Sequence, residues 1–321
     1  MNFTMEFGVS YFGNRIVRHV AKDLESLKRS GFGFVVHTFS ENDLLFSRGT
    51  MKEIVSVTRD LGLETWMDPW GVGRVFGGEA FSYWTSRFPE ICQRDSAGNA
   101  VPAACPNHPK FRQLAGGWIE AAAETGAKWV FLDEPHFFTS AFIPYEKKAE
   151  VCHCEHCRKK RGDRDFQGFL ADSLADCLSA LTREASKCGL KNSVCLLPPE
   201  IDPQPVPWER VAQDPNLQNL GADPYWMLVN RGPEEYVKEY GQKIRGLAAK
   251  RNLETHLWIQ GFKVPKGREK EIPVAVKTAV ECGVSQVAFW GFDACAHISS
   301  IAPDDPAATW KAILSAVRSC K

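Results

Sequence analysis

The chain has 321 residues, a length that fits one large domain of alternating strands and helices. Lys plus Arg and Asp plus Glu both number 39, and this zero net charge argues against a nucleic-acid or membrane-surface protein, which binds through excess positive charge. The 44% of hydrophobic residues can form a large core, but no apolar run of about eighteen residues predicts a transmembrane helix.

The N-terminal residues MNFTMEFGVSYFG contain neither the basic segment nor the apolar core of a secretory signal. The eleven cysteines are an odd number and show no disulfide-like spacing. We therefore expect a cytoplasmic protein with reduced thiols. A homo-oligomer is left open, because composition does not decide the oligomeric state.

Eight short apolar runs recur along the chain, and their composition predicts β-strands at 7–11, 33–37, 64–68, 128–132, 193–197, 217–222, 255–260 and 285–290. Helical spacing of apolar residues between them predicts helices near 16–30, 51–61, 111–125, 165–187, 233–247, 272–282 and 306–317. Nearly continuous apolar strands are typical of a parallel sheet that is covered on both faces.

Eight strand–helix units in series predict a (β/α)8 TIM barrel of the α/β class. The alternative, a doubly wound open sheet, usually has a glycine-rich phosphate loop after the first strand, and Tyr11-Phe12-Gly13-Asn14 is not one. We expect a single domain over residues 1–321. A long excursion at 71–110 follows the third strand, and a second long loop at 135–162 follows the fourth.

The active site of such a barrel lies at the carboxyl ends of the strands. In this chain those ends are rich in carboxylates and aromatic rings, with candidate site residues Tyr11, His37, Asp68, Trp70, Asp133, Glu134, His136, Glu200, Asp223, Tyr225, Trp226, Gln260 and Trp290. Carboxyl groups can protonate or attack at an anomeric carbon, and aromatic rings stack on the faces of sugars. The ring of residues therefore predicts a carbohydrate substrate and a glycoside hydrolase.

Two consecutive carboxylates, Asp133 and Glu134, end the fourth predicted strand. Because neighbouring strand residues point to opposite faces, we expect one carboxylate to face the pocket and the other to support it. We assign Glu134 as general acid, with Asp223 as first choice for the second carboxylate and Glu200 as the next. Helix-capping, ion-pair and turn roles are the structural alternatives for these residues.

The sequence Cys152-x-Cys154-x-x-Cys157 has the spacing of thiolates that bind one tetrahedral Zn²⁺ ion. The best candidate for a fourth ligand is Cys105, at the end of the long excursion; the alternatives are Cys92, His153 and His156. Four protein ligands would make the zinc structural. A redox Cys-x-x-Cys at Cys154–Cys157 is the competing interpretation, against which the third cysteine argues.

Residues 85–160 resemble glycoside hydrolase family 42 β-galactosidases. The segments that carry the resemblance are Arg87–Ile91, Asp95–Gly98, Ala104–Asn107, Phe131–His136 and then the three spaced cysteines. The resemblance implies that Glu134 is the acid/base residue and that Cys105, Cys152, Cys154 and Cys157 hold a structural zinc. The family's strand-seven nucleophile is not matched, because Gln260 stands there, and Asp133 replaces the asparagine before the acid/base.

Two other functions remain as alternatives. Gln260 at the nucleophile position favours a barrel that binds sugar without hydrolysing it. A metal-dependent barrel enzyme would use His37, Asp68 and His136, although no strand carries the His-x-His pair that we would expect of one.

Overall fold

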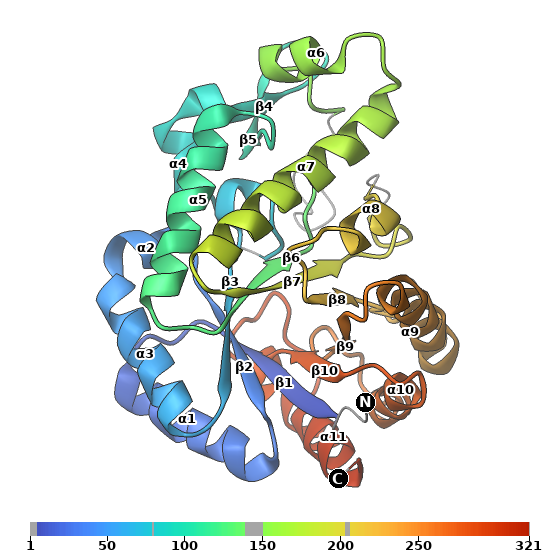
Figure 1. Cartoon of the computed structure of the whole chain (residues 1–321). Helices are drawn as coiled ribbons and strands as arrows, with labels where there is room; N and C mark the ends of the chain where they lie inside the picture. The colour runs from blue at the N-terminus through green and yellow to red at the C-terminus, as the bar shows by residue number, and fades with distance from the viewer. Residues whose placement is uncertain (1–4, 79, 139–149, 203–205, 321) are drawn as a thin grey trace.

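The computed structural model describes residues 5–78, 80–138, 150–202 and 206–320, so part of the predicted loop 135–162 lies outside the described residues. Eight parallel strands close into a barrel in the order β1-β10-β9-β8-β7-β6-β3-β2, with helices around it (Figure 1). The strands are β1 (Glu6–Tyr11), β2 (Phe34–Thr38), β3 (Glu64–Asp68), β6 (Trp129–Asp133), β7 (Lys191–Leu196), β8 (Asn219–Ala222), β9 (Glu254–Gln260) and β10 (Gln286–Trp290). The predicted (β/α)8 barrel is confirmed.

The long helices follow the predicted positions: α1 (Val17–Ser30), α3 (Arg48–Asp60), α5 (Pro109–Glu124), α7 (Phe166–Lys187), α9 (Pro233–Ala249), α10 (Glu271–Glu281) and α11 (Pro306–Ser319). Short helical segments lie between them: α2 (Glu41–Phe46), η1 (Val72–Arg74), α4 (Tyr83–Arg87), η2 (Pro89–Ile91), α6 (Glu155–Arg161), α8 (Trp208–Ala212) and η3 (Phe292–Cys295).

Local sequence signals determine where several helices begin and end. Helix α1 ends at Gly31, whose φ of 97° is a left-handed conformation that glycine adopts without steric cost. Helix α7 begins after Asp165, whose carboxylate accepts a hydrogen bond from the Gly168 amide at 2.7 Å. Helix α11 begins in the same way, because Asp305 accepts from the Ala308 amide at 2.9 Å.

Alternation along the strands divides the side chains into an outer and an inner set. On β6, Val130 and Leu132 pack outward in the main core, whereas Trp129 and Phe131 point into the barrel. Trp66 of β3 stacks on the ring of Trp129, with centroids 4.8 Å apart. This aromatic layer fills the barrel, so a substrate site must lie beyond it, at an end of the strands.

The excursion at 71–110 contains an antiparallel pair, β4 (Cys92–Arg94) and β5 (Ala100–Ala104), that the sequence analysis did not predict. Its turn is closed by Asp95, whose side chain accepts from the Asn99 amide at 2.8 Å. Ala103 of β5 belongs to a small second core with Phe137 and Phe169. Figure 1 shows β4, β5 and α6 together beyond one end of the barrel.

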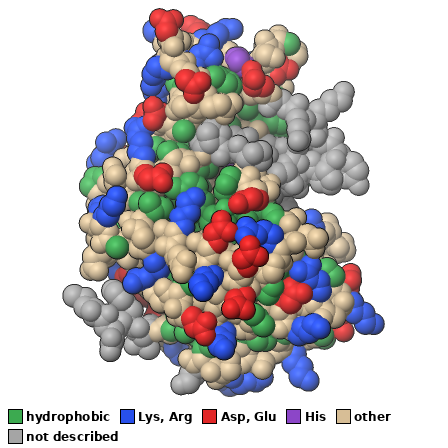
Figure 2. All heavy atoms as spheres, turned by 90° about the vertical axis from the view of Figure 1, so that its right-hand side faces the viewer, with side chains coloured by type: hydrophobic (Ala, Val, Ile, Leu, Met, Phe, Trp, Pro, Cys, Tyr) green, Lys and Arg blue, Asp and Glu red, His purple; other side chains and the backbone are tan. Residues whose placement is uncertain are grey.

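The surface in Figure 2 carries Lys and Arg side chains interspersed with Asp and Glu side chains. This mixture agrees with the equal numbers of basic and acidic residues in the whole sequence. Within the described part of the chain, no helix combines the length and the apolar character that crossing a membrane requires.

Candidate active site

Three inward-facing residues meet at the carboxyl end of the barrel. Asp133 ends β6, Cys195 lies opposite it on β7, and Asp223 directly follows β8. One ligand atom from each lies within 4.8 Å of the others, and all three side chains are buried. The carboxylates at the ends of the fourth and sixth strands of the barrel therefore converge beside a thiol on the fifth.

Glu134 leaves the alternation of the strand because its φ is 41°, in the left-handed region. This conformation is costly for a residue with a side chain, by about 1 kcal/mol or more, and must be held by its surroundings. Its amide donates to the Cys195 carbonyl at 3.1 Å, and its carbonyl oxygen contacts Nδ1 of His136 at 2.5 Å. The His136 amide in turn donates to the Val75 carbonyl at 2.9 Å, which ties the segment to the excursion.

Both carboxylates of the pair reach the same glycine. A Cβ atom built on Gly77 would lie 2.5 Å from Oε2 of Glu134 and 3.1 Å from Oδ2 of Asp133. The Gly77 amide also donates to the Asp133 carbonyl at 3.0 Å. Because β6 ends at Asp133, the left-handed turn at Glu134 brings its side chain to the side of Asp133, and both carboxylates contact Gly77.

Burial clearly changes the pKa of the Asp223 carboxylate. It is 1% exposed, and this burial raises its pKa from 3.8 to about 7, while hydrogen bonds from Cys195 and Tyr225 oppose the rise. The Cys195 thiol donates to Oδ2 of Asp223 at 3.2 Å. Burial and the neighbouring carboxylates raise the pKa of this thiol, so it stays protonated and acts as a donor. Asp223 can therefore gain or lose a proton near neutral pH.

Tyr225 joins this group. Burial raises the pKa of its hydroxyl, and the charges of Asp223, Glu134 and Asp133 raise it further. Its ring packs edge-on against Phe262, with centroids 5.0 Å apart. Tyr225 is therefore a neutral hydroxyl beside three carboxyl groups, as expected of a group that hydrogen-bonds either a carboxylate or a substrate.

A line of aromatic rings leads from the barrel interior to the loop after β3. The rings of Trp258 and Trp290 lie 5.8 Å apart, Trp290 stacks on Phe12 at 5.1 Å, and Phe12 lies 5.7 Å from Trp70. Gln260 is buried on the same inner face as Trp258, and its amide nitrogen donates to the Phe262 carbonyl at 3.0 Å. Of the other predicted residues, Asp68 is buried on the inner side of β3, and His136 is buried with its pKa lowered to about 4 by desolvation.

Two predicted site residues on β1 and β2 face the helices instead. The Tyr11 hydroxyl donates to Oδ2 of Asp23 on α1 at 2.7 Å, and Nε2 of His37 lies 2.9 Å from Oγ1 of Thr58 on α3. Both residues have the parity of the outward side chains on their strands, which corrects their assignment to the site. The suggested metal set of His37, Asp68 and His136 is therefore not assembled, because His37 points out of the barrel.

Two further predicted residues lie outside the ring. Glu200 is exposed and accepts a hydrogen bond from the Tyr240 hydroxyl of α9 at 2.5 Å. Trp226 is buried, and its indole nitrogen donates to Oε2 of Glu271 on α10 at 2.7 Å. Both follow a strand by several residues, so the loop has already turned toward the helix layer.

Four buried cysteines form a second cluster, away from the carboxylates. The sulfur atoms of Cys105, Cys152, Cys154 and Cys157 all lie within 4.8 Å of one another. The Cys105 and Cys157 sulfurs are 3.3 Å apart, and those of Cys105 and Cys154 are 3.6 Å apart. Tetrahedral zinc with bonds of about 2.3 Å would separate its sulfurs by about 3.8 Å, so the donor set fits this ion.

The surroundings of the cysteine cluster suit thiolates. The side-chain amide of Asn107 donates to Sγ of Cys157 at 3.3 Å, and its backbone amide donates to Sγ of Cys105 at 3.4 Å. Such donors stabilise negative sulfur and orient it. The other candidate ligands lie elsewhere: Cys92 contacts the Thr85 carbonyl, His153 stacks on Phe166 and His156 packs against His108.

Sequence reasoning missed two residues of the candidate site. Cys195 was not among the predicted site residues, although its inward parity on β7, next to the strand that leads to Asp223, could have indicated its place. Gly77 stood in an excursion without periodicity, and its contact with the carboxylates had no signal in the sequence.

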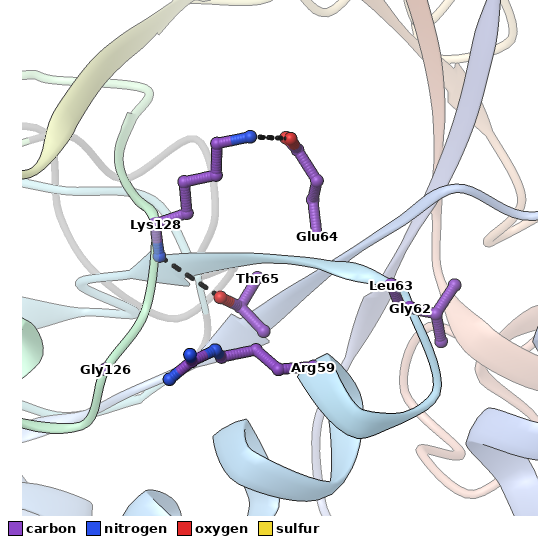
Figure 3. Close-up of a pocket in the computed structure, with 7 residues that line it drawn as sticks. All are labelled: Arg59, Gly62, Leu63, Glu64, Thr65, Gly126 and Lys128. Atoms are coloured by element: carbon purple, nitrogen blue, oxygen red, sulfur yellow. Dashed lines mark hydrogen bonds and ion pairs between the residues drawn. The ribbon is translucent and has the colours of Figure 1, made fainter.

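A separate hollow of about 250 Å³ lies at the opposite end of the barrel strands, near the start of β3 (Figure 3). Lys128 spans it by pairing with the Glu64 carboxylate, and its amide donates to Oγ1 of Thr65 at 3.1 Å. The hollow lies at the amino ends of the strands, and the one carboxylate among its lining residues, Glu64, is paired with Lys128. It is therefore a poor candidate for a catalytic site.

Comparison with known proteins supports the fold. No family model matches the sequence, and no curated protein matches it. Among solved structures, a β-galactosidase from Bacillus circulans sp. alkalophilus is 13% identical with a TM-score of 0.66, aligned over 90% of this chain and 50% of its own. This chain thus spans half the length of that enzyme.

Two further solved structures align over most of both chains. GH5_18 from Streptomyces cattleya in complex with GlcNAc is 12% identical with a TM-score of 0.66, over 100% of this chain and 81% of its own. An endo-1,4-β-mannanase from Rhizomucor miehei is 10% identical with a TM-score of 0.66, over 99% and 95%. Identities this low establish the common barrel and no more.

Proposed function

We propose that this protein is a glycoside hydrolase whose site is the carboxylate group of Asp133, Glu134 and Asp223. The observation that carries the proposal is the convergence of these buried carboxyls at the carboxyl end of the barrel, beside Tyr225 and the line of aromatic rings. Glycosidic bonds are broken by paired carboxyl groups, and aromatic rings bind the faces of sugars. The barrels that this fold resembles include a β-galactosidase and a mannanase, which agrees with the proposal.

In this mechanism Glu134 gives a proton to the oxygen of the leaving group as the bond to the anomeric carbon breaks. Asp223 serves as general base and takes a proton from the attacking water. A base with a pKa of about 7 is well matched to this task at neutral pH, because it can be ionised and still bind a proton strongly. Asp133 is the inward neighbour of Glu134 and supports it. The proposal predicts inversion at the anomeric carbon.

Matched variants test these roles on a panel of aryl glycosides. Glu134→Gln should lower kcat about 10²–10⁴-fold on nitrophenyl substrates and much less on dinitrophenyl substrates, whose leaving group needs no proton. Asp223→Asn should lower kcat on both. Glu200→Gln is the control, since this carboxylate also follows a strand but contacts Tyr240 on the outside.

NMR of the first product shows whether the anomeric configuration is inverted. Full activity of Glu134→Gln on all substrates would sink the assignment of the acid. Retention of configuration would make Asp223 a nucleophile rather than a base.

We also propose that Cys105, Cys152, Cys154 and Cys157 hold a structural zinc ion. Four sulfur ligands leave no open position, so the ion would stabilise the fold and take no part in bond cleavage. It would connect the end of the excursion, at Cys105, to the start of α6, at Cys154 and Cys157. Metal analysis of the purified protein should find about one zinc per chain, and Cys152→Ser should lose it.

A sugar-binding barrel without hydrolysis is the second candidate, and Gln260 on the inner face of β9 favours it. The same panel separates the two functions. Saturable binding of sugars, with no turnover of any activated glycoside, would select this candidate.

A further inference from the structure

Glu41 is a buried carboxylate that the proposed mechanism does not use. It opens the short helix α2, in the loop after β2, and is 2% exposed. Burial raises its pKa, against hydrogen bonds from Gly73, Ser82 and Trp84 that favour the charged form. A carboxylate kept in such a place needs several donors, because an unpaired buried charge is very costly.

The donors come from the excursion after β3. Oε1 of Glu41 accepts from the Gly73 amide at 2.7 Å and from the Ser82 hydroxyl at 2.7 Å. Oε2 accepts from the Trp84 amide at 2.6 Å. One side chain thus binds the excursion at two points of the chain, on either side of Gly77.

Between these two points the excursion contacts the candidate acids. The Gly77 amide donates to the Asp133 carbonyl, and a Cβ atom on Gly77 would lie 2.5 Å from Oε2 of Glu134 and 3.1 Å from Oδ2 of Asp133. The Gly71 amide closes this turn by donating to the Gly77 carbonyl at 2.8 Å. If the excursion loosened at Gly73 and Trp84, Gly77 would no longer limit where the Glu134 carboxylate can move.

We propose that Glu41 is a positioning residue, which holds Gly77 against the carboxylates of Asp133 and Glu134 and so fixes the direction of the acid. The catalytic part of this inference rests on the proposed function. Glu41 itself touches neither acid; it acts through the excursion. Geometry of this kind matters because an acid displaced by about 1 Å can lose roughly 10²-fold in rate.

The neighbouring residue Asp43 provides a matched control. It is a buried carboxylate on the same helix, but it pairs with Arg15 at 2.6 Å and caps the helix through Ser40. Asp43→Asn therefore disturbs α2 without removing a bond to the excursion. Glu41→Gln removes the charge and places an amide against donors that need an acceptor.

Hydrogen exchange of the intact protein is the first measurement. In Glu41→Gln the peptides covering residues 71–78 and 80–88 should exchange at least 10-fold faster than in the wild type, whereas in Asp43→Asn the excess exchange should be confined to α2. Kinetics on the best aryl glycoside is the second measurement. Glu41→Gln should lower kcat at least 10-fold with KM changed less than 3-fold, and Asp43→Asn should keep kcat within 2-fold.

If Glu41→Gln does not fold, Ser82→Ala removes one donor and should act in the same direction with a smaller effect. Unchanged exchange at 71–78 overturns the proposal. Faster exchange with unchanged kcat also overturns it, because Glu41 would then only stabilise the excursion. If the wild type hydrolyses no glycoside, the proposed function fails separately, and exchange at 71–78 alone decides whether Glu41 holds Gly77.

Discussion

The thiol of Cys195 on β7 donates a hydrogen bond to the carboxylate of Asp223, which follows the neighbouring strand β8. The distance between Sγ and Oδ2 is 3.2 Å. This bond favours the ionised carboxylate and so opposes the effect of burial on its pKa. The thiol therefore helps to set the pH at which Asp223 becomes a base.

Removing this donor should shift the pH dependence of activity. In the wild type, kcat/KM should rise with pH through about 7 as Asp223 loses its proton. Cys195→Ala should move this limb to higher pH, because the ionised form loses its donor. Cys177→Ala is the control, since this buried thiol of α7 belongs to the outer core. A limb that stays in place in Cys195→Ala would show that the thiol does not tune Asp223.

Asp223 should also make the stability of the fold depend on pH. Its folded pKa of about 7 lies above the ordinary 3.8, so the folded state binds the proton more tightly than the unfolded state. Stability from this group is therefore present at acidic pH and is lost as pH rises from about 4 to about 7. At about 1.36 kcal/mol per unit, the loss is at most about 4 kcal/mol.

Urea unfolding at pH 5 and pH 8 measures this effect as a difference between wild type and Asp223→Asn. The variant should gain stability relative to the wild type at pH 8 and gain little at pH 5. An equal difference at the two pH values would contradict a raised pKa.

Gly77→Ala should damage activity more than stability. The new Cβ would lie 2.5 Å from Oε2 of Glu134, so the carboxylate must move. We expect kcat to fall at least 10-fold. Gly116→Ala on α5 is the control, because nothing lies within 4 Å of its Cβ and alanine favours the helix by about 0.5–1 kcal/mol. Equal kcat values for the two variants would refute the contact between Gly77 and the acid.

Loss of the proposed zinc should unfold a region before it unfolds the barrel. The four cysteines belong to the small core with Phe137 and Phe169, separate from the main core of the barrel. Chelation or Cys152→Ser should therefore increase hydrogen exchange in β4, β5 and α6 while β1 and β10 stay protected. Cys188→Ser, at an exposed thiol, controls for the substitution. Simultaneous exchange of the whole chain would contradict a local role.

The barrel could be predicted from the sequence because its strands are strongly apolar and its helices carry clear ends, such as Gly31 and Asp165. Cys105 was named as the best fourth cysteine because it ends the excursion, and the structure brings it to the other three. The antiparallel pair β4–β5 was missed because three to five residues are too few to show a period.

The site was harder to predict than the fold. Tyr11 ends β1 and His37 is the next-to-last residue of β2. Successive strand residues point to opposite faces, so a shift of one position turns a side chain from the barrel interior to the helices. Glu134 breaks the alternation through a left-handed backbone, with its amide bonded to the Cys195 carbonyl and its carbonyl oxygen in contact with His136. The bond to Cys195 joins two strands that lie far apart in sequence, so no local pattern could show it.

The packed rings of Trp66, Trp129, Phe131 and Trp258 fill the barrel between its two ends. If the protein acts as proposed, water and protons reach Asp223 from the carboxyl end of the strands, which forms the mouth of the barrel. A substrate that fills the mouth would close this route and isolate the carboxylates from bulk solvent. The acids would then keep, for the duration of one turnover, the protons that they held when the substrate bound.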